Sequence, residues 1–264
     1  MGVLRVAPLG TCRVHRPLRK ISKGEGIEVF SDPINQYVHT TGEIIQRIGL
    51  LNGDSPNPES LEKYIFERDL DRGGPNFPIM ESDLFVIEVS SIKQISLGNY
   101  SLQLNRVINE AKPKLGSRFD EWMSILRRRV KDGYRPVDRV EEISNDPWEM
   151  IDQLSSHIQD ELDLERGVGK IIELLGGNVC LVNHINIEKP DGEKLLSRNL
   201  LCEMLSSVAK RFGVLLFDPT NLVLEERSKM LKKGGLDINH YSDYGEERIG
   251  RELMAFVRMV DSMT

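Results

Sequence analysis

The sequence lacks the short motifs that mark the commonest cofactor and metal sites. It has no CxxC pair, no GxGxxG string and no GxxxxGK[ST] string, so zinc, dinucleotide and P-loop nucleotide binding have no local support. Only 3 of its 264 residues are cysteines, and Cys12, Cys180 and Cys202 do not have the spacing of metal ligands. No apolar run approaches the length that spans a membrane.

An export signal is also missing from the N-terminus, because the apolar stretch 3–9 is short and contains Arg5 and Pro8. We therefore expect a cytoplasmic protein with reduced thiols. The formal net charge of −6 argues against a general nucleic-acid surface. With 39% hydrophobic residues, the chain can form one large domain, and we predict a single domain over residues 1–264. No feature of the sequence determines an oligomeric state.

Apolar stretches of strand length recur along the chain, with helical patterns between them. They lie at residues 3–9, 27–30, 83–89, 179–182 and 214–217. Nearly continuous apolar strands that alternate with helices are typical of a parallel sheet covered on both faces. The sequence therefore predicts an α/β fold around a five-stranded parallel sheet.

Three helices have clear sequence signals. A capping-box pattern runs from Thr40 to Glu43, and Ser242 can cap a terminal helix. Between residues 195 and 212, apolar side chains recur at i, i+4 intervals and predict a buried stripe. That stripe consists of Leu196, Leu200, Met204, Val208 and Phe212.

One segment breaks the alternation of strands and helices. Roughly ninety residues separate the third and fourth predicted strands, too many for a simple crossover. We predict a helical insertion over residues 104–175. It contains three consecutive arginines at 127–129, which form either a solvated helix face or an anion clamp for a phosphate or sugar nucleotide.

Polar residues follow several of the predicted strands, where α/β sheets bind ligands. Asn183 and His184 follow the fourth strand, and Asn183 is either an oxyanion donor or a loop residue. Ser90 follows the third strand and offers a hydroxyl group. His39 precedes the capped helix and is a further candidate for lining a pocket. Cys180 and Cys202 are expected in the core.

The ends of the chain carry the residues best suited to nucleophilic chemistry. Asp237 stands three residues before His240 at the start of the last helix, so the carboxylate can orient the imidazole and leave its other nitrogen free as a base. Cys12 follows the first strand in Gly10-Thr11-Cys12. A thiol at such a turn can have a lowered pKa, although free cysteines are more often buried as apolar residues.

The string Asp237-x-x-His240-x-Ser-Asp-x-Gly245, followed by an amphipathic helix, resembles the last conserved block of SGNH (GDSL-like) hydrolases. The first block of that superfamily is Gly-Asp-Ser, and Gly10-Thr11-Cys12 stands in its place. Cysteine at this turn is closer to the GSCFA-domain proteins and the SGNH-like enzymes of capsule polysaccharide biosynthesis. The resemblance covers residues 1–100 and 176–264.

This resemblance implies a flavodoxin-like three-layer α/β/α fold and an acyl-transfer site. Cys12 would be the nucleophile, with His240 as base and Asp237 as orienting group. The oxyanion or substrate would be bound by residues drawn from Thr11, His39, Gly42, Ser90, Asn183 and His184. No copy of the superfamily's Gly-x-Asn-Asp block is present, and Ser90 stands at its place.

The implied reaction is O-acyl transfer to a carbohydrate, or hydrolysis of a small acyl ester or thioester. No metal or resident cofactor is required, and an acyl-CoA is a reasonable co-substrate. An alternative is a non-catalytic module of the same shape that binds a glycan or a protein. Phosphoryl or sulfuryl chemistry at the arginine triplet is a third hypothesis.

Overall fold

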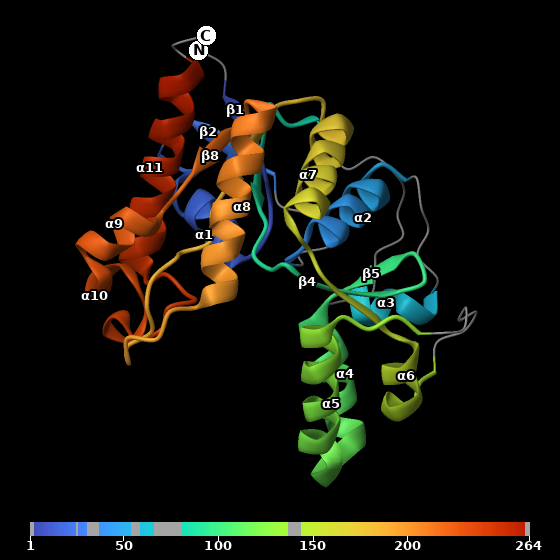
Figure 1. The fold of residues 1–264 in the computed structure, drawn as a ribbon. Helices are drawn as coiled ribbons and strands as arrows, with labels where there is room; N and C mark the ends of the chain where they lie inside the picture. The colour runs from blue at the N-terminus through green and yellow to red at the C-terminus, as the bar shows by residue number, and fades with distance from the viewer. Residues whose placement is uncertain are drawn as a thin grey trace.

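A five-stranded parallel sheet forms the centre of the computed structural model, which describes residues 3–24, 26–30, 37–53, 59–65, 81–136 and 144–261. The strand order is β2-β1-β3-β7-β8 (Figure 1). The strands are β1 (Leu4–Leu9), β2 (Ile27–Val29), β3 (Leu84–Glu88), β7 (Val179–Val182) and β8 (Leu215–Phe217). This is the flavodoxin-like strand order. From β1 the chain adds β2 on one side and then β3, β7 and β8 on the other, so the switch point of the sheet lies between β1 and β3. The predicted fold class and all five strands are confirmed.

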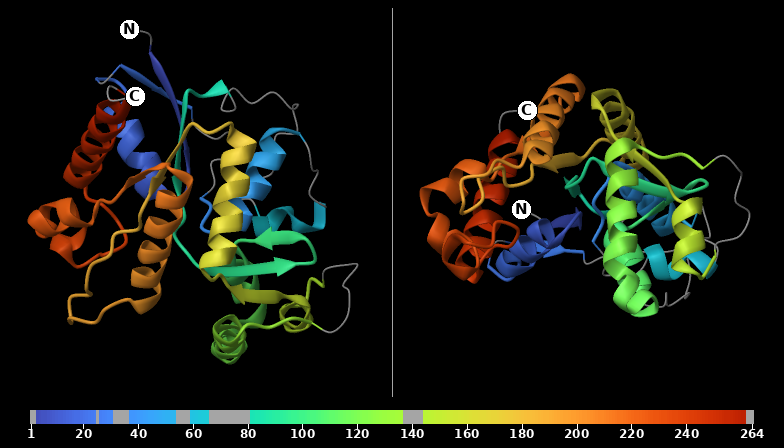
Figure 2. Two further views of the ribbon diagram at one scale, coloured as in Figure 1. Left: turned by 45° about the horizontal axis from the view of Figure 1, so that its top comes forward. Right: turned by 60° about the horizontal axis from the view of Figure 1, so that its bottom comes forward.

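Helices cover both faces of the sheet and complete three layers (Figure 2). One face packs against α1 (Cys12–Ile21) and α11 (Asp243–Asp261). The other packs against α2 (Thr41–Leu51), α7 (Glu161–Leu175) and α8 (Leu196–Phe212). Two separate hydrophobic clusters result, one on each side of the sheet.

Adjacent positions of the central strands are both apolar because each strand contributes to both clusters. In β3, Phe85 and Ile87 belong to the cluster of α2, α7 and α8, whereas Leu84 and Val86 belong to the cluster of α1 and α11. Successive side chains of a strand point to opposite faces. Cys180 lies in the second cluster, as predicted for a core residue.

The capping signals are confirmed at two helices. The Thr40 hydroxyl accepts from the Glu43 N–H at 3.3 Å, and the Glu43 carboxyl group accepts from the His39 N–H at 3.1 Å. The Ser242 hydroxyl accepts from the Gly245 N–H at 3.0 Å at the start of α11. No helix in the described part of the chain is both long and apolar enough to cross a bilayer.

The predicted buried stripe of α8 is wrong at three of its five positions. Leu196, Leu200 and Phe212 are exposed, at 78%, 46% and 41%. An i, i+4 row rotates about 40° around the helix at each step because a turn holds 3.6 residues, so a row of five positions leaves the buried face. The core instead receives neighbouring residues of the same helix, namely Leu201, Cys202, Met204, Leu205, Val208 and Ala209.

The stretch of chain between β3 and α7 forms a second lobe (Figure 1). It contains an antiparallel sheet in the order β5-β4-β6. Its elements are β4 (Lys93–Leu97), β5 (Tyr100–Leu102), α4 (Leu104–Leu115), a 3-10 turn (Gly116–Arg118), α5 (Phe119–Asp132), α6 (Pro147–Gln153) and β6 (Ser155–Ile158). Helix α3 (Glu59–Ile65) packs beside α4 and β5.

This lobe, residues 93–158, is called the insertion below. The segment predicted as a helical insertion, 104–175, also contains the strand β6 and the helix α7, which packs against α2 and α8 of the main domain. The alternation of apolar and polar residues in β4 and β6 is short, and partner strands far apart in sequence form the small sheet. Local periodicity gave no indication of that pairing.

Candidate active site

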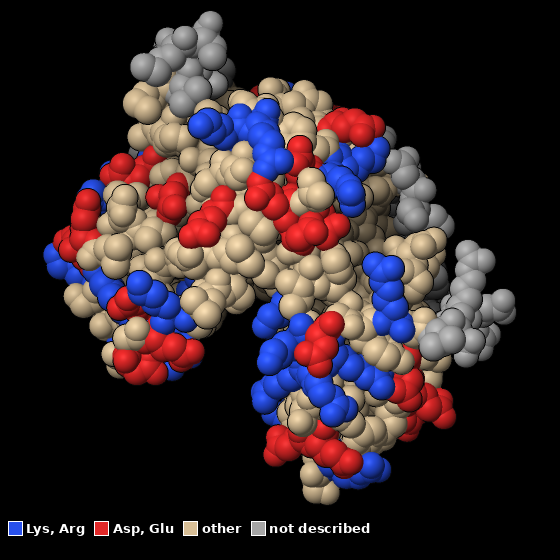
Figure 3. Space-filling view, in the orientation of Figure 1, with Lys and Arg blue, Asp and Glu red and all other residues tan. Residues whose placement is uncertain are grey.

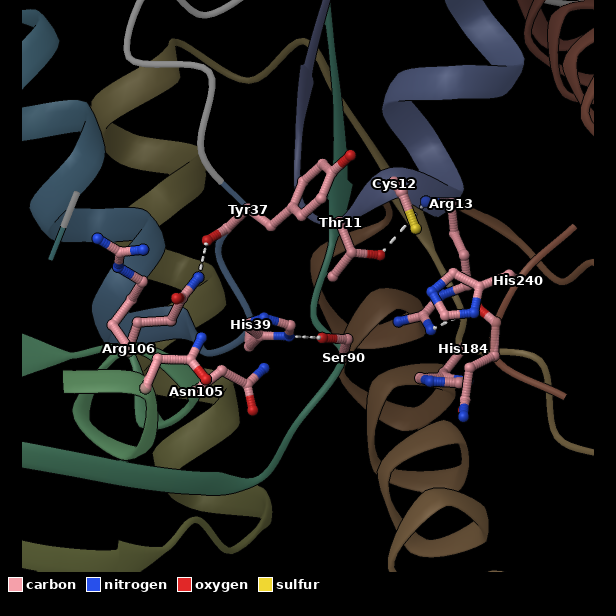
Figure 4. A pocket seen from close by; sticks show the side chains of 13 residues that line it. Thr11, Cys12, Arg13, Tyr37, His39, Ser90, Asn105, Arg106, His184 and His240 are labelled. Atoms are coloured by element: carbon pink, nitrogen blue, oxygen red, sulfur yellow. Dashed lines mark hydrogen bonds between the residues drawn. The ribbon is translucent and has the colours of Figure 1, made fainter. Parts of the chain in front are cut away.

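A cavity of about 480 Å³ opens between the carboxyl ends of the sheet strands and the insertion (Figure 4). This volume lies within the range of roughly 300–1,000 Å³ typical of small-molecule sites. Its lining residues are Thr11, Cys12, Arg13, Tyr37, His39, Ser90, Gln103, Asn105, Arg106, Asn109, His184, Asn239 and His240. Six of the nine predicted site residues, His240 among them, therefore line the cavity.

His240 and Asp237 form the predicted pair in the loop before α11. The imidazole Nδ1 lies 3.0 Å from one Asp237 carboxylate oxygen and 3.1 Å from the other. Burial alone would raise the pKa of Asp237, but hydrogen bonds from the Asn239 N–H and the His240 ring outweigh it and lower that pKa. The ionised carboxylate holds the proton on Nδ1, which leaves Nε2 free to accept a proton. The His240 side chain is 48% exposed and can reach a bound molecule.

Cys12 is the first residue of α1 and faces the same cavity as His240 (Figure 4). Its predicted low pKa is wrong: burial raises the pKa of the thiol, and the charges of Arg13 and Arg16 offset only part of the increase. No hydrogen bond joins the thiol to His240 within the part of the chain that is described. Cys12 thus rests as a protonated thiol, and a base would have to remove its proton before it could act as a nucleophile.

A buried ion pair holds the Cys12 turn against β3. Glu88 is fully buried at the end of β3 and accepts from the Arg13 Nε at 2.5 Å. The same carboxylate accepts from the N–H and the hydroxyl of Thr11, at 3.0 and 2.5 Å. A Cβ atom at Gly10 would lie 2.7 Å from the Glu88 Cβ, so only glycine fits there. Thr11 was predicted to bind the oxyanion, yet both of its donors are already used by Glu88.

The Asp237–His240 loop is held from two directions. Arg13 donates to the Asn239 carbonyl at 3.4 Å. Arg198, from α8, donates to the Ile238 carbonyl at 3.4 Å and to the Asn239 side chain at 2.9 Å. Arg13 therefore links the Cys12 turn and the Glu88 carboxylate to the histidine loop, which comes from the other end of the sequence.

His39 and Ser90 form a second hydrogen-bonded pair in the cavity, joined by 2.8 Å between Nδ1 and Oγ. The His39 carbonyl accepts from the N–H groups of Ser90 and Ser91, at 2.8 and 3.0 Å. Burial lowers the pKa of His39, so the ring is neutral near pH 7. With one bond inside the pair, one N–H or O–H remains to donate into the cavity, whichever tautomer is present.

The other three predicted residues occupy different surroundings. His184 lines the cavity, but its Nδ1 lies 3.0 Å from the Ile185 carbonyl, and burial lowers its pKa well below the ordinary value. Asn183 donates to Asp218 at 3.0 Å and is not among the lining residues. Gly42 packs against Gln94 and Ser101 of the small sheet, and a Cβ there would lie 2.5 Å from the Ser101 hydroxyl oxygen. Asn183 and Gly42 are thus brought into the framework and not into the cavity.

The TviD N-terminal domain family matches residues 4–256. The chain belongs to this family. The Vi polysaccharide biosynthesis protein TviD of Salmonella typhi is 24% identical in an alignment over 258 residues, and the alignment covers 92% of this chain and 30% of that protein. The chain therefore spans less than a third of the length of this curated relative.

Solved structures of the M. smegmatis aryl esterase, native and inhibitor-bound, align with 97% of this chain and 99% of the esterase chain. Each is 12% identical to it, with a TM-score of 0.39.

In this TviD-family domain, no signal in the sequence indicated that the insertion lines the cavity. Gln103, Asn105, Arg106 and Asn109 all come from the start of α4. Only contacts between lobes make them neighbours of Cys12. Glu88 was also missed, although a carboxylate inside the apolar run of a doubly covered strand is itself a signal of a buried polar function.

The arginine triplet of the domain divides into two kinds of residue. Arg129 donates to Asp152 at 2.5 Å and lies over the Tyr134 ring at 4.2 Å. Arg127 and Arg128 are exposed on α5. Because of its contacts with Asp152 and Tyr134, Arg129 is a structural residue of the insertion. Figure 3 shows Lys and Arg side chains gathered where the lobe of α4 and α5 faces the hollow beside the main domain.

Proposed function

We propose that this domain transfers or hydrolyses acyl groups on a carbohydrate or small acyl ester, with Cys12 as nucleophile. The observation that carries the proposal is the meeting of Cys12 and the Asp237–His240 pair in one cavity. These three residues come from opposite ends of the chain. A nucleophile, a base and a group that orients the base are the parts that acyl transfer requires.

The raised pKa of Cys12 assigns a definite task to His240. Because the thiol is protonated at neutral pH, His240 Nε2 accepts its proton as the sulfur attacks the acyl carbonyl. The imidazolium then protonates the leaving thiolate or alkoxide of the donor. Asp237 stabilises the imidazolium through its contact with Nδ1.

Two groups are placed to stabilise the tetrahedral oxyanion. The Cys12 N–H is at the first position of α1, where helix N–H groups have no partner within the helix. The His39–Ser90 pair supplies a second, neutral donor from beyond the carboxyl end of the neighbouring strand β3. Such donors act where negative charge develops in the transition state.

The substrate class rests on the family and on the cavity. The relative from Salmonella typhi is named for polysaccharide biosynthesis, and the cavity lining is mostly polar. A carbohydrate hydroxyl group is thus the proposed acceptor, and an acyl-CoA thioester is a suitable donor for a cysteine nucleophile. Hydrolysis of an O-acyl ester would use the same residues with water as the acceptor.

Mass spectrometry of the protein after incubation with acetyl-CoA or p-nitrophenyl acetate tests the proposal. We expect an acetyl group on Cys12 and turnover that falls by at least about 10³ in Cys12→Ala. Cys202→Ala serves as the matched control, because that thiol lies in α8 outside the cavity lining. Equal turnover by the Cys12→Ala variant and the native protein would remove the covalent mechanism.

A non-catalytic glycan- or protein-binding module is the second candidate function. It is favoured by the raised pKa of Cys12, which makes the thiol a weak nucleophile without its base. Iodoacetamide labelling at neutral pH separates the two functions. A Cys12 that labels no faster than the buried Cys180 supports the binding module, whereas selective labelling that Asp237→Asn slows supports the enzyme.

A further inference from the structure

The cavity has two walls of different chemistry (Figure 4). Cys12, Arg13 and His240 lie on one side, and α4 of the insertion lies on the opposite side, with His39 and Ser90 between them. The α4 wall contributes Asn105 and Asn109, one helical turn apart. Residues at i and i+4 share a helix face, so both amides face the cavity from the same side.

Neighbouring residues hold the α4 wall in place. The Gln103 side chain donates to the Tyr37 carbonyl at 2.6 Å, and the Gln103 N–H donates to the Tyr64 carbonyl at 3.1 Å. Arg106 donates to the Lys63 carbonyl at 3.4 Å. These contacts tie α4 to α3 and to the segment before α2, so the wall is a built surface.

Asn105 and Asn109 do not help to hold α4 in place. Both side chains are exposed in the cavity, and neither makes a hydrogen bond to another residue in the described ranges. Each amide presents two donor hydrogens and an acceptor oxygen. A sugar hydroxyl is likewise both donor and acceptor, whereas a phosphate offers acceptors alone and an acyl chain offers neither.

We propose that the α4 face formed by Asn105 and Asn109 binds the hydroxyl groups of a carbohydrate acceptor opposite Cys12. This assignment rests on the proposed function, in which Cys12 carries the acyl group. It makes the insertion the acceptor subsite and leaves the main domain to supply the covalent chemistry. Recognition by amide hydrogen bonds is typical of polar sites that fix the orientation of a ligand.

The subsite has a definite role in the second half of the reaction. An acceptor hydroxyl held by α4 attacks the carbonyl carbon of the acyl-Cys12 thioester and gives its proton to His240. The new C–O bond forms, the C–S bond breaks, and the Cys12 thiolate recovers the proton from His240. If water enters in place of the sugar, the same steps give hydrolysis, so occupancy of the α4 face favours transfer.

Saturation-transfer NMR with three methyl glycosides tests binding apart from catalysis. The probes are the glycosides of a neutral hexose, an N-acetylhexosamine and a hexuronic acid. We expect at least one to bind both the native protein and Cys12→Ala, and the double variant Asn105→Ala/Asn109→Ala to bind it about tenfold more weakly. Lys112→Ala is the matched control, since it changes an exposed residue of α4 outside the cavity lining.

Kinetics on two substrates complete the test. Hydrolysis of p-nitrophenyl acetate should stay within about twofold in the double variant, whereas acyl transfer to the glycoside should fall about tenfold. Asn105→Asp/Asn109→Asp keeps the side-chain size, removes the amide donors and should show the same split. Circular dichroism melts verify that these variants fold.

Several results would overturn the subsite. The subsite is refuted if the native protein binds none of the three glycosides. It is also refuted if the asparagine variants bind as tightly as the native protein, or if they lose hydrolysis and transfer to the same extent. A native protein that binds glycosides through α4 but never acylates Cys12 would refute the proposed function and leave the subsite standing.

Discussion

The main domain and the insertion differ in charge as well as in architecture. The insertion, residues 93–158, contains eleven basic and ten acidic side chains, a formal charge of +1, whereas the whole chain has 35 basic and 41 acidic residues and a charge of −6. The remainder of the chain therefore has a charge of −7. The basic side chains collect where the insertion faces the hollow (Figure 3).

The two regions also contribute to the cavity in different ways. In the main domain, Cys12 and the Asp237–His240 loop are held by buried groups such as Glu88 and Arg13. In the insertion, Asn105 and Asn109 project from a firmly held helix without partners among the described residues. Substitutions in the main domain should therefore damage chemistry or folding, whereas those in the insertion should change recognition.

Asp237→Asn should cause the largest loss of activity, a drop in kcat of about 10²–10⁴. An amide in place of the carboxylate no longer stabilises the His240 imidazolium or enforces the Nδ1–H tautomer. The loss is measured as kcat for an activated acetyl ester, with the melting temperature recorded beside it. Asp191→Asn, an exposed turn substitution outside the cavity lining, should retain full activity; a similar decrease in both variants would contradict the role of Asp237.

Glu88→Ala should have the largest effect on stability, because it leaves the Arg13 guanidinium buried without its partner. Removing one member of a buried ion pair costs about 3–5 kcal/mol. Urea denaturation of the variant measures that loss. Glu173→Ala breaks an exposed pair with Lys170 and should change stability by less than about 1 kcal/mol. Comparable midpoints for the two variants would show that Glu88 is not a framework residue.

Acid should destabilise the main domain through its buried histidines. Burial lowers the pKa of His15 to about 3, from an ordinary value of 6.5. Between these values the unfolded chain binds a proton that the folded chain does not, so stability falls as pH decreases below about 6.5. His39 and His184 act in the same direction.

Replacing His15 with phenylalanine should flatten the decline in unfolding free energy between about pH 6.5 and pH 5. Urea titrations at several pH values measure the slope. Leu224→Ala, which changes an exposed residue without a titratable group, is the control and should leave the slope in this interval unchanged. An unaltered slope in His15→Phe would mean that the ring binds a proton in the folded protein as readily as in the unfolded chain.

The smallest effects are expected within the arginine triplet of α5. Arg129→Ala should cost about 1 kcal/mol through loss of the Asp152 pair and the Tyr134 contact. Arg127→Ala/Arg128→Ala should change neither the melting temperature nor ester hydrolysis. Thermal melts and an ester assay compare the variants. If both variants instead weaken binding of inorganic phosphate to the same degree, the triplet acts as an anion clamp.

Much of the fold could be predicted because its signals are local. Continuous apolar strands such as 83–89 reflect burial on both faces, and Thr40 and Ser242 cap helices within a few residues of themselves. The predicted α8 stripe was wrong because helical rotation over four i, i+4 steps carries residues such as Leu196 and Phe212 away from the core. The small sheet was not predicted because β4 and β6 pair across a long stretch of chain.

The candidate site was predictable where a residue's neighbours in sequence define its role. Asp237 and His240 are three residues apart, and their hydrogen bond is formed within one turn of chain. Gly42 was expected in the pocket from the family resemblance, and Asn183 from its place after a strand, but packing against Ser101 and a bond to Asp218 hold them elsewhere. The pKa of Cys12 depended on burial, which a single turn motif does not determine.

The sequence by itself determined the strands, the parallel α/β class and the oriented histidine, since each depends on periodicity or on contacts a few residues long. Only the tertiary structure decided that Cys12 lies in the same cavity as His240 and that α4 forms the opposite wall. It also decided that Glu88 pairs with Arg13 beneath them. These outcomes depend on the order of strands and the packing of two lobes, which bring residues from distant parts of the chain together at one end of the sheet.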